Sequence, residues 1–125
     1  MDAPQTPGDW LYRATSDGST AMFGRPGNPP SAWLTCRRAG GVVEISAAGA
    51  ISGPMIVRTE SVDRPVNLAP AAQEPPAAVA RVPAQDSLLD AMAYSKGRFA
   101  LEAAGAPPLY LPAWPEVARV IEDCR

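Results

Sequence analysis

The end of the chain, residues 115–125, constrains the fold most, because its pattern predicts a helix that carries a cysteine into the core. Pro115 suits the first position of a helix, where its missing N–H needs no intrahelical partner, and Trp114 can precede it as the flanking residue. Four apolar residues follow at the i, i+3, i+4, i+7 spacing of one helical face: Val117, Val120, Ile121 and Cys124. We therefore expect the segment to dock through this face.

The chain's other cysteine, Cys36, lies in a strand-like run over residues 32–36. Because side chains alternate along a strand, Cys36 shares a face with Leu34. Both thiols are then expected to point inward, which predicts a Cys36–Cys124 disulfide between the terminal helix and this strand. Such a bond favours an oxidising compartment.

The rest of the chain is expected to form short strands, because fifteen prolines and ten glycines interrupt every long periodic run. The run 69–77, rich in Ala, Pro, Gln and Glu, is expected to be an exposed loop. A short helix is expected over 88–95, capped through the Ser87-x-x-Asp90 pattern and with Lys96 near its last turn. Strands are expected over 10–15, 20–24, 31–37, 42–47, 55–59, 66–68, 78–82, 98–103 and 109–111.

These elements predict an α+β fold, a β-rich antiparallel sandwich or half-barrel with a short helix and a C-terminal helix packed on it. The length of 125 residues suits a single β-rich domain over 10–125. Residues 1–9 are expected to be a flexible N-terminal linker, and residues 1–8 look like the polar stretch that follows a removed signal peptide. The alternative is a cytoplasmic protein with a flexible start.

Charge and composition exclude several classes of function. The net charge of −2 gives no electrostatic attraction to nucleic acid, and no stretch approaches the roughly 20 apolar residues of a membrane span. The chain contains no histidine, which excludes Ser–His and Cys–His nucleophilic systems and most transition-metal sites. Phosphate-binding and dinucleotide-binding glycine motifs are absent, so we expect no metal and no cofactor.

The remaining catalytic alternative is a carboxylate pair. Asp86 and Asp90 lie four residues apart at the predicted start of a helix, which could place both on one face. Acids in the first turn also complement the helix dipole, so a capping role is the favoured interpretation. A second alternative is an anion site, formed if arginines of separate elements converge. The favoured interpretation is that these arginines face solvent and that some of them pair with glutamates. The arginines concerned are Arg58, Arg81, Arg98 and Arg119.

The candidate partner-binding residues are concentrated in the C-terminal third: Tyr94, Arg98, Tyr110 and Trp114. Tyrosine, tryptophan and arginine are enriched at the energetic centres of protein interfaces. The prolines between these positions stiffen the connections and lower the cost of presenting a surface. If these residues do not bind a partner, the loop over residues 25–30 is the next candidate.

The segments 86–99 and 109–116 and the ending 122–125 resemble a group of small uncharacterised exported proteins of sphingomonad-type alphaproteobacteria. More distantly, the β-rich body with an early cysteine and a late helix is similar to the invasion-associated locus B family of periplasmic proteins. The resemblance implies an envelope location and brings no active site.

Together these observations predict a periplasmic or secreted, non-catalytic module that binds an envelope protein or a cell-surface component. Two alternatives of other classes stay open. One is a small carboxylate-dependent hydrolase or transferase, and the other is a cytoplasmic partner-binding protein.

Overall fold

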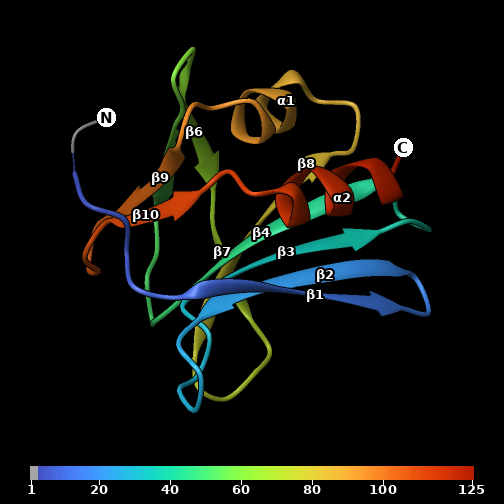
Figure 1. The fold of residues 1–125 in the computed structure, drawn as a ribbon. Helices are drawn as coiled ribbons and strands as arrows, with labels where there is room; N and C mark the ends of the chain where they lie inside the picture. The colour runs from blue at the N-terminus through green and yellow to red at the C-terminus, as the bar shows by residue number, and fades with distance from the viewer. Residues whose placement is uncertain (1–2) are drawn as a thin grey trace.

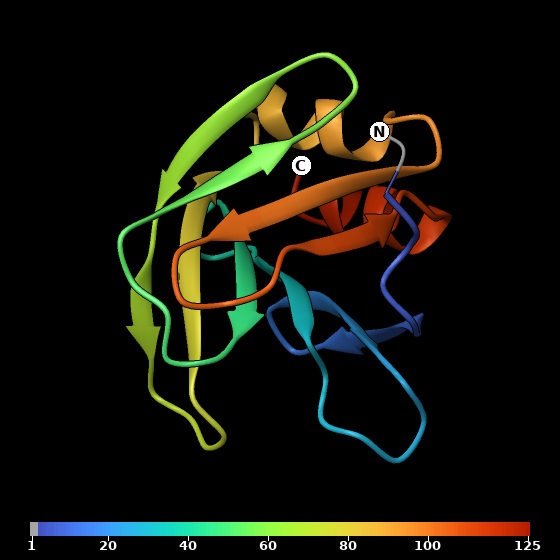
Figure 2. The ribbon, with the colours of Figure 1, turned by 90° about the vertical axis from the view of Figure 1, so that its left-hand side faces the viewer.

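The computed structural model describes residues 3–125, which form two antiparallel sheets and two helices (Figures 1 and 2). The six-stranded sheet has the order β1-β2-β3-β4-β8-β7, and the four-stranded sheet has the order β10-β9-β5-β6. The predicted α+β sandwich is confirmed, and neither sheet closes into a barrel. The elements are β1 Asp9–Thr15, β2 Gly18–Gly24, β3 Ala32–Arg37, β4 Val42–Ala48, β5 Pro54–Arg58, β6 Asp63–Asn67, β7 Ala69–Ala71, β8 Ala77–Pro83, α1 Ser87–Ala93, β9 Arg98–Ala103, β10 Leu109–Pro112 and α2 Pro115–Asp123.

Strands β2 and β3 of the larger sheet alternate between a buried and a more exposed side, as the sequence pattern predicts. In β3, Leu34 and Cys36 are buried while Trp33 and Thr35 are partly exposed. The buried side of the six-stranded sheet faces the smaller sheet and the helices. The other side of the six-stranded sheet is called its outer face. The core therefore lies between the layers and includes Phe23, Leu34, Ile45, Met55, Leu88, Phe99 and Val117.

Helix α2 lies across the inner face of β1, β2 and β3 and begins as predicted (Figure 1). Trp114 occupies the N-cap position and Pro115 the first turn. Val117, Val120 and Ile121 are buried. The predicted disulfide joins Cys36 to Cys124, with the two Cα atoms 5.4 Å apart and 88 residues between them in the sequence.

The predicted bounds of helix α1 need correction at both ends. The cap is Asp86, whose carboxylate accepts the backbone N–H of Leu88 at 2.9 Å, so Ser87 is the first helical residue and not the cap. The helix ends at Ala93, which leaves Lys96 outside the last turn. The other oxygen of the Asp86 carboxylate binds Arg64 of β6, a contact that the local pattern does not contain.

The run 69–77 is not an unbroken loop. Residues 69–71 form β7, which pairs with the start of β8, and Ala77 belongs to β8. The loop prediction depended on the Ala, Pro, Gln and Glu composition of the run, and such a composition does not prevent backbone pairing over a few residues. The rest of the run connects these two strands.

The N-terminal segment lies along the outer edge of β10 (Figure 2). The backbone N–H of Thr6 donates to the carbonyl of Tyr110 at 2.9 Å, and the Thr6 hydroxyl accepts the N–H of Tyr110 at 2.9 Å. Arg98 donates to the carbonyl of Ala3. The sequence predicts a flexible linker over residues 1–9 and does not reveal these contacts. Residues 1–2 of this predicted linker lie outside the described residues.

Candidate functional site

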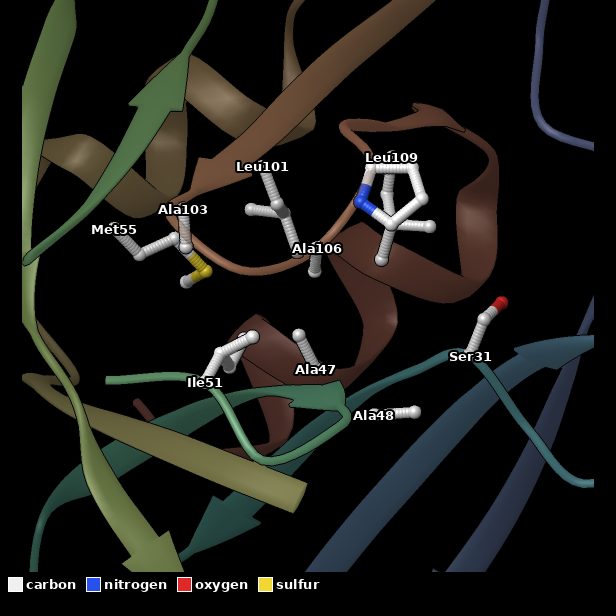
Figure 3. A pocket seen from close by; sticks show the side chains of 10 residues that line it. Ser31, Ala47, Ala48, Ile51, Met55, Leu101, Ala103, Ala106 and Leu109 are labelled. Carbon is white, nitrogen blue, oxygen red and sulfur yellow. The ribbon is translucent and has the colours of Figure 1, made fainter. Parts of the chain in front are cut away.

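An apolar pocket opens between the two sheets, where β4 leads into β5 and β9 turns into β10 (Figure 3). Its volume is about 100 Å³. Figure 3 shows side chains from both sheets and from the two connections facing one another across the space. The lining residues are Ser31, Ala47, Ala48, Ile51, Met55, Leu101, Ala103, Ala106, Pro107 and Leu109.

The pocket exists because small side chains meet where the two layers separate. Ala47 faces it from β4, and Ala106 faces it from the β9–β10 connection (Figure 3). A longer aliphatic side chain at either position would occupy the space between the sheets. The alanine methyl groups leave that space open, and Ile51 and Met55 form an apolar wall beside it.

None of the side chains that line the pocket carries a charge. All of the lining residues except Leu101 belong to three segments without an acidic or basic residue, which are 26–36, 45–57 and 103–115. The one hydroxyl in the lining, on Ser31, donates to the carbonyl of Phe23 at 3.2 Å. A group that enters the pocket therefore meets apolar atoms and a hydroxyl that already has a partner.

This geometry suits a small apolar group. An engineered apolar cavity of about 150 Å³ admits benzene, whereas pockets for drug-sized ligands measure about 300–1,000 Å³. At about 100 Å³ the pocket can hold one branched aliphatic side chain or the end of an alkyl chain. Burial of apolar surface contributes roughly 25 cal/mol per Å², which makes such an insertion favourable.

The predicted partner-binding residues do not form one patch. Tyr94, at the end of α1, is 76 % exposed. Arg98 and Tyr110 lie on one face of the β9–β10 pair and contact the N-terminal segment. Trp114 lies in a separate shallow hollow with Tyr12, Pro115, Glu116 and Arg119. Of the predicted four, Tyr110 is nearest in sequence to the pocket, since its neighbour Leu109 lines it.

Asp86 and Asp90 are each held by an arginine. The hydrogen bond from Arg64, 2.6 Å from Asp86, lowers the pKa of that carboxyl, and the N–H of Leu88 adds to the effect. Arg125 binds both oxygens of Asp90, at 2.6 and 3.1 Å, and lowers its pKa. A general acid at neutral pH needs a raised pKa, so these environments suit structural ion pairs.

The four arginines considered as an anion site do not converge. Arg58 pairs with Glu102 and Asp63, both at 2.8 Å, and Arg81 pairs with Glu44 at 3.0 Å. Arg119 lies over the ring of Tyr12, 4.0 Å from its centre. Within residues 3–125, no group of three acidic or cysteine side chains is arranged to hold a metal ion.

Sequence reasoning missed the pocket, since its alanines carry no chemical signal of their own. The three charge-free segments are the one feature that could have indicated it, because charged side chains are excluded from an apolar mouth.

The fold and the pocket define a small, disulfide-bonded two-sheet protein with an apolar site between its layers. No protein-family model, curated protein or solved structure matches the chain. The resemblance to exported alphaproteobacterial proteins therefore stays a prediction.

Proposed function

We propose that the protein is a non-catalytic binding module of the cell envelope, which seats an apolar side chain of a protein partner in the pocket between its sheets. The observation that carries this proposal is the pocket itself: an open, uncharged space of about 100 Å³ among ordered strands. Interface anchors are typically single side chains inserted into pockets of this kind.

The size of the pocket favours a protein partner over a lipid. A long acyl chain needs several times this volume, whereas one leucine, isoleucine or valine side chain fills it. The pocket is formed by β-strands and two short connections, and the β9–β10 connection is stiffened by Pro107 and Pro108, so little ordering is required there when a partner binds.

The envelope location rests on the disulfide between Cys36 and Cys124, a bond that persists in oxidising compartments. Neither helix of residues 3–125 has the length and apolar character needed to cross a membrane. The module would then act in the periplasm or outside the cell.

Site-specific photocrosslinking in intact cells tests this function. A photoreactive phenylalanine analogue at Pro107, which is exposed at the pocket, should crosslink one protein of the envelope fraction. The same analogue at Ala39, in the turn at the other end of β3 and β4, serves as the control and should not. Equal products from both positions, or none from Pro107, would contradict the proposal.

A further inference from the structure

The outer face of the six-stranded sheet carries two parallel rows of side chains across neighbouring strands. The first row is largely apolar and consists of Leu11, Met22, Trp33, Ser46 and Val79, each in register with the next. The second row is polar and consists of Thr20, Thr35, Glu44 and Arg81. Because α2 packs on the other side of the sheet, no helix within residues 3–125 covers these rows (Figure 1).

Two loops project from the sheet on this side and border the rows (Figures 1 and 2). Residues 70–73 enclose a hollow of about 440 Å³ over Trp33 and Glu44. Residues 24–28 enclose a second hollow, of about 400 Å³, over Leu11 and Met22. Since Met22 and Trp33 are paired neighbours, the two hollows adjoin. We call this combined surface the outer groove.

The polar part of the outer groove contains an ion cluster with spare positive charge. Glu44, 9 % exposed, accepts from Nε of Arg37 and lies 3.0 Å from Nε of Arg81. Both arginine side chains are more than half exposed, and no other acid within residues 3–125 forms an ion pair with them. Their terminal nitrogens are thus available for a ligand.

Three positively charged residues line the outer groove, namely Arg25, Arg37 and Arg81, and two negatively charged residues line it, namely Asp9 and Glu44. The groove is therefore locally positive on a protein whose net charge is −2. Guanidinium groups bind carboxylate, phosphate and sulfate oxygens in a bidentate manner, so the excess charge favours an anionic ligand.

The floor of the outer groove favours a saccharide over an extended peptide. Strands β2, β3, β4 and β8 are each paired on both sides, so their backbone groups are not free to bind a peptide main chain. Recognition must therefore use side chains. A partly exposed tryptophan, Trp33, offers a flat apolar surface for the C–H face of a sugar ring. The hydroxyl of Thr35 and the amide of Gln73 can hydrogen-bond to its hydroxyls.

We propose that the outer groove binds an acidic saccharide, with one ring stacked on Trp33 and its anionic group held by Arg37 and Arg81. This site is separate from the pocket between the sheets, which shares only strand β4 with it and lies between the two layers.

A glycan array of acidic and neutral cell-surface oligosaccharides tests this proposal with the full-length protein. We expect retention of uronic-acid-containing or phosphorylated oligosaccharides and not of their neutral counterparts. Titration calorimetry with the best-retained glycan should show an affinity that falls as salt is added, because the ion pairs with the arginines are screened. Retention of no acidic glycan, or equal retention of neutral ones, would overturn the proposal.

Three variants locate the binding. Trp33→Ala and Arg81→Gln should each weaken binding by at least about tenfold, as expected for a contact that dominates a small site. Arg119→Gln, which removes an exposed arginine outside the groove, should leave it unchanged. If an acidic peptide competes for the groove as effectively as the glycan does, the groove would be assigned to acidic peptides. That result would overturn the proposal of a saccharide ligand.

Discussion

At the scale of single residues, the disulfide restricts which amino acids can occupy the positions beside it. A Cβ atom built on Gly18 would lie 2.7 Å from Sγ of Cys36 and 2.8 Å from its carbonyl oxygen. Gly18 also has a φ of +140°, in the region that favours glycine. The absence of a side chain at Gly18 is thus what allows β2 to lie beside the disulfide of β3.

Gly18→Ala should therefore destabilise the protein by about 1 to 3 kcal/mol, since the methyl group overpacks a site that backbone and disulfide make rigid. Chemical denaturation of the oxidised protein measures the change. Gly40→Ala is the matched control, because a Cβ there meets nothing closer than 3.7 Å and φ is not positive. Equal stabilities of the two variants would show that the space beside Cys36 can adapt.

At the scale of elements, both helices are tied down by contacts distant in sequence. Helix α1 is held at its start by the Asp86–Arg64 pair to β6 and within its first turn by the Asp90–Arg125 pair to the C-terminus. Helix α2 is held by its buried face and by the disulfide at its end. Because both are short, their stability depends on docking more than on helix propensity.

Ile121→Ala should cost about 2 to 4 kcal/mol, the usual range for truncating a buried aliphatic side chain. Ile121 is 2 % exposed on the docked face of α2. The exposed neighbour Glu122 offers the control, and Glu122→Ala should change the free energy of unfolding by less than about 0.5 kcal/mol. An Ile121→Ala variant that melts at the wild-type temperature would mean that α2 is not docked through this face.

The ion pairs of α1 predict a loss of stability in acid. Hydrogen bonds from Arg64 and Arg125 lower the folded-state pKa values of Asp86 and Asp90 below their ordinary value of 3.8. Their stabilisation is present above that value and is lost as the pH falls through the lowered pKa values, because the unfolded state then binds more protons. Thermal melts between pH 7 and pH 2 should show this loss.

Asp86→Asn isolates one of the two pairs, because asparagine caps a helix as well as aspartate does but carries no charge. The decline in stability toward acid should be shallower in this variant than in the wild type. An exposed acid outside the pairs, Glu74, provides the control, and Glu74→Gln should retain the wild-type profile. A profile of Asp86→Asn identical to that of the wild type would contradict the role of the Arg64 pair.

At the scale of the whole molecule, local patterns predicted the framework and long-range packing determined the sites. Alternation in residues 32–36 and the apolar stripe of 117–124 were enough to predict the disulfide, since each locates one inward thiol. At the start of α1 the capping role favoured for Asp86 is correct, whereas the Ser87-x-x-Asp90 pattern was wrong in making Ser87 the cap. The Asp86–Arg64 pair could not be predicted locally, because Arg64 lies more than twenty residues earlier.

The location of the pocket could not be predicted for a related reason. It requires that segments 26–36, 45–57 and 103–115 converge at one end of the sandwich, and no local periodicity encodes that convergence. Likewise, the four predicted partner-binding residues share a region of the sequence but lie in three places of the fold. Residue type alone suggested these candidates, and the topology determines where each of them lies.

The most direct test of the account is a binding measurement with a variant whose pocket is filled by a larger side chain. The quantity measured is the Kd of this variant for the partner that crosslinking identifies. Ala106→Leu places three more carbon atoms in the space between the sheets, and Ala39→Leu makes the same change at an exposed turn. With both variants shown to be folded, we expect Ala106→Leu to raise the Kd by at least about tenfold, or about 1.4 kcal/mol, and Ala39→Leu to leave it unchanged. Wild-type affinity in the Ala106→Leu variant would contradict the claim that the partner inserts a side chain into this pocket.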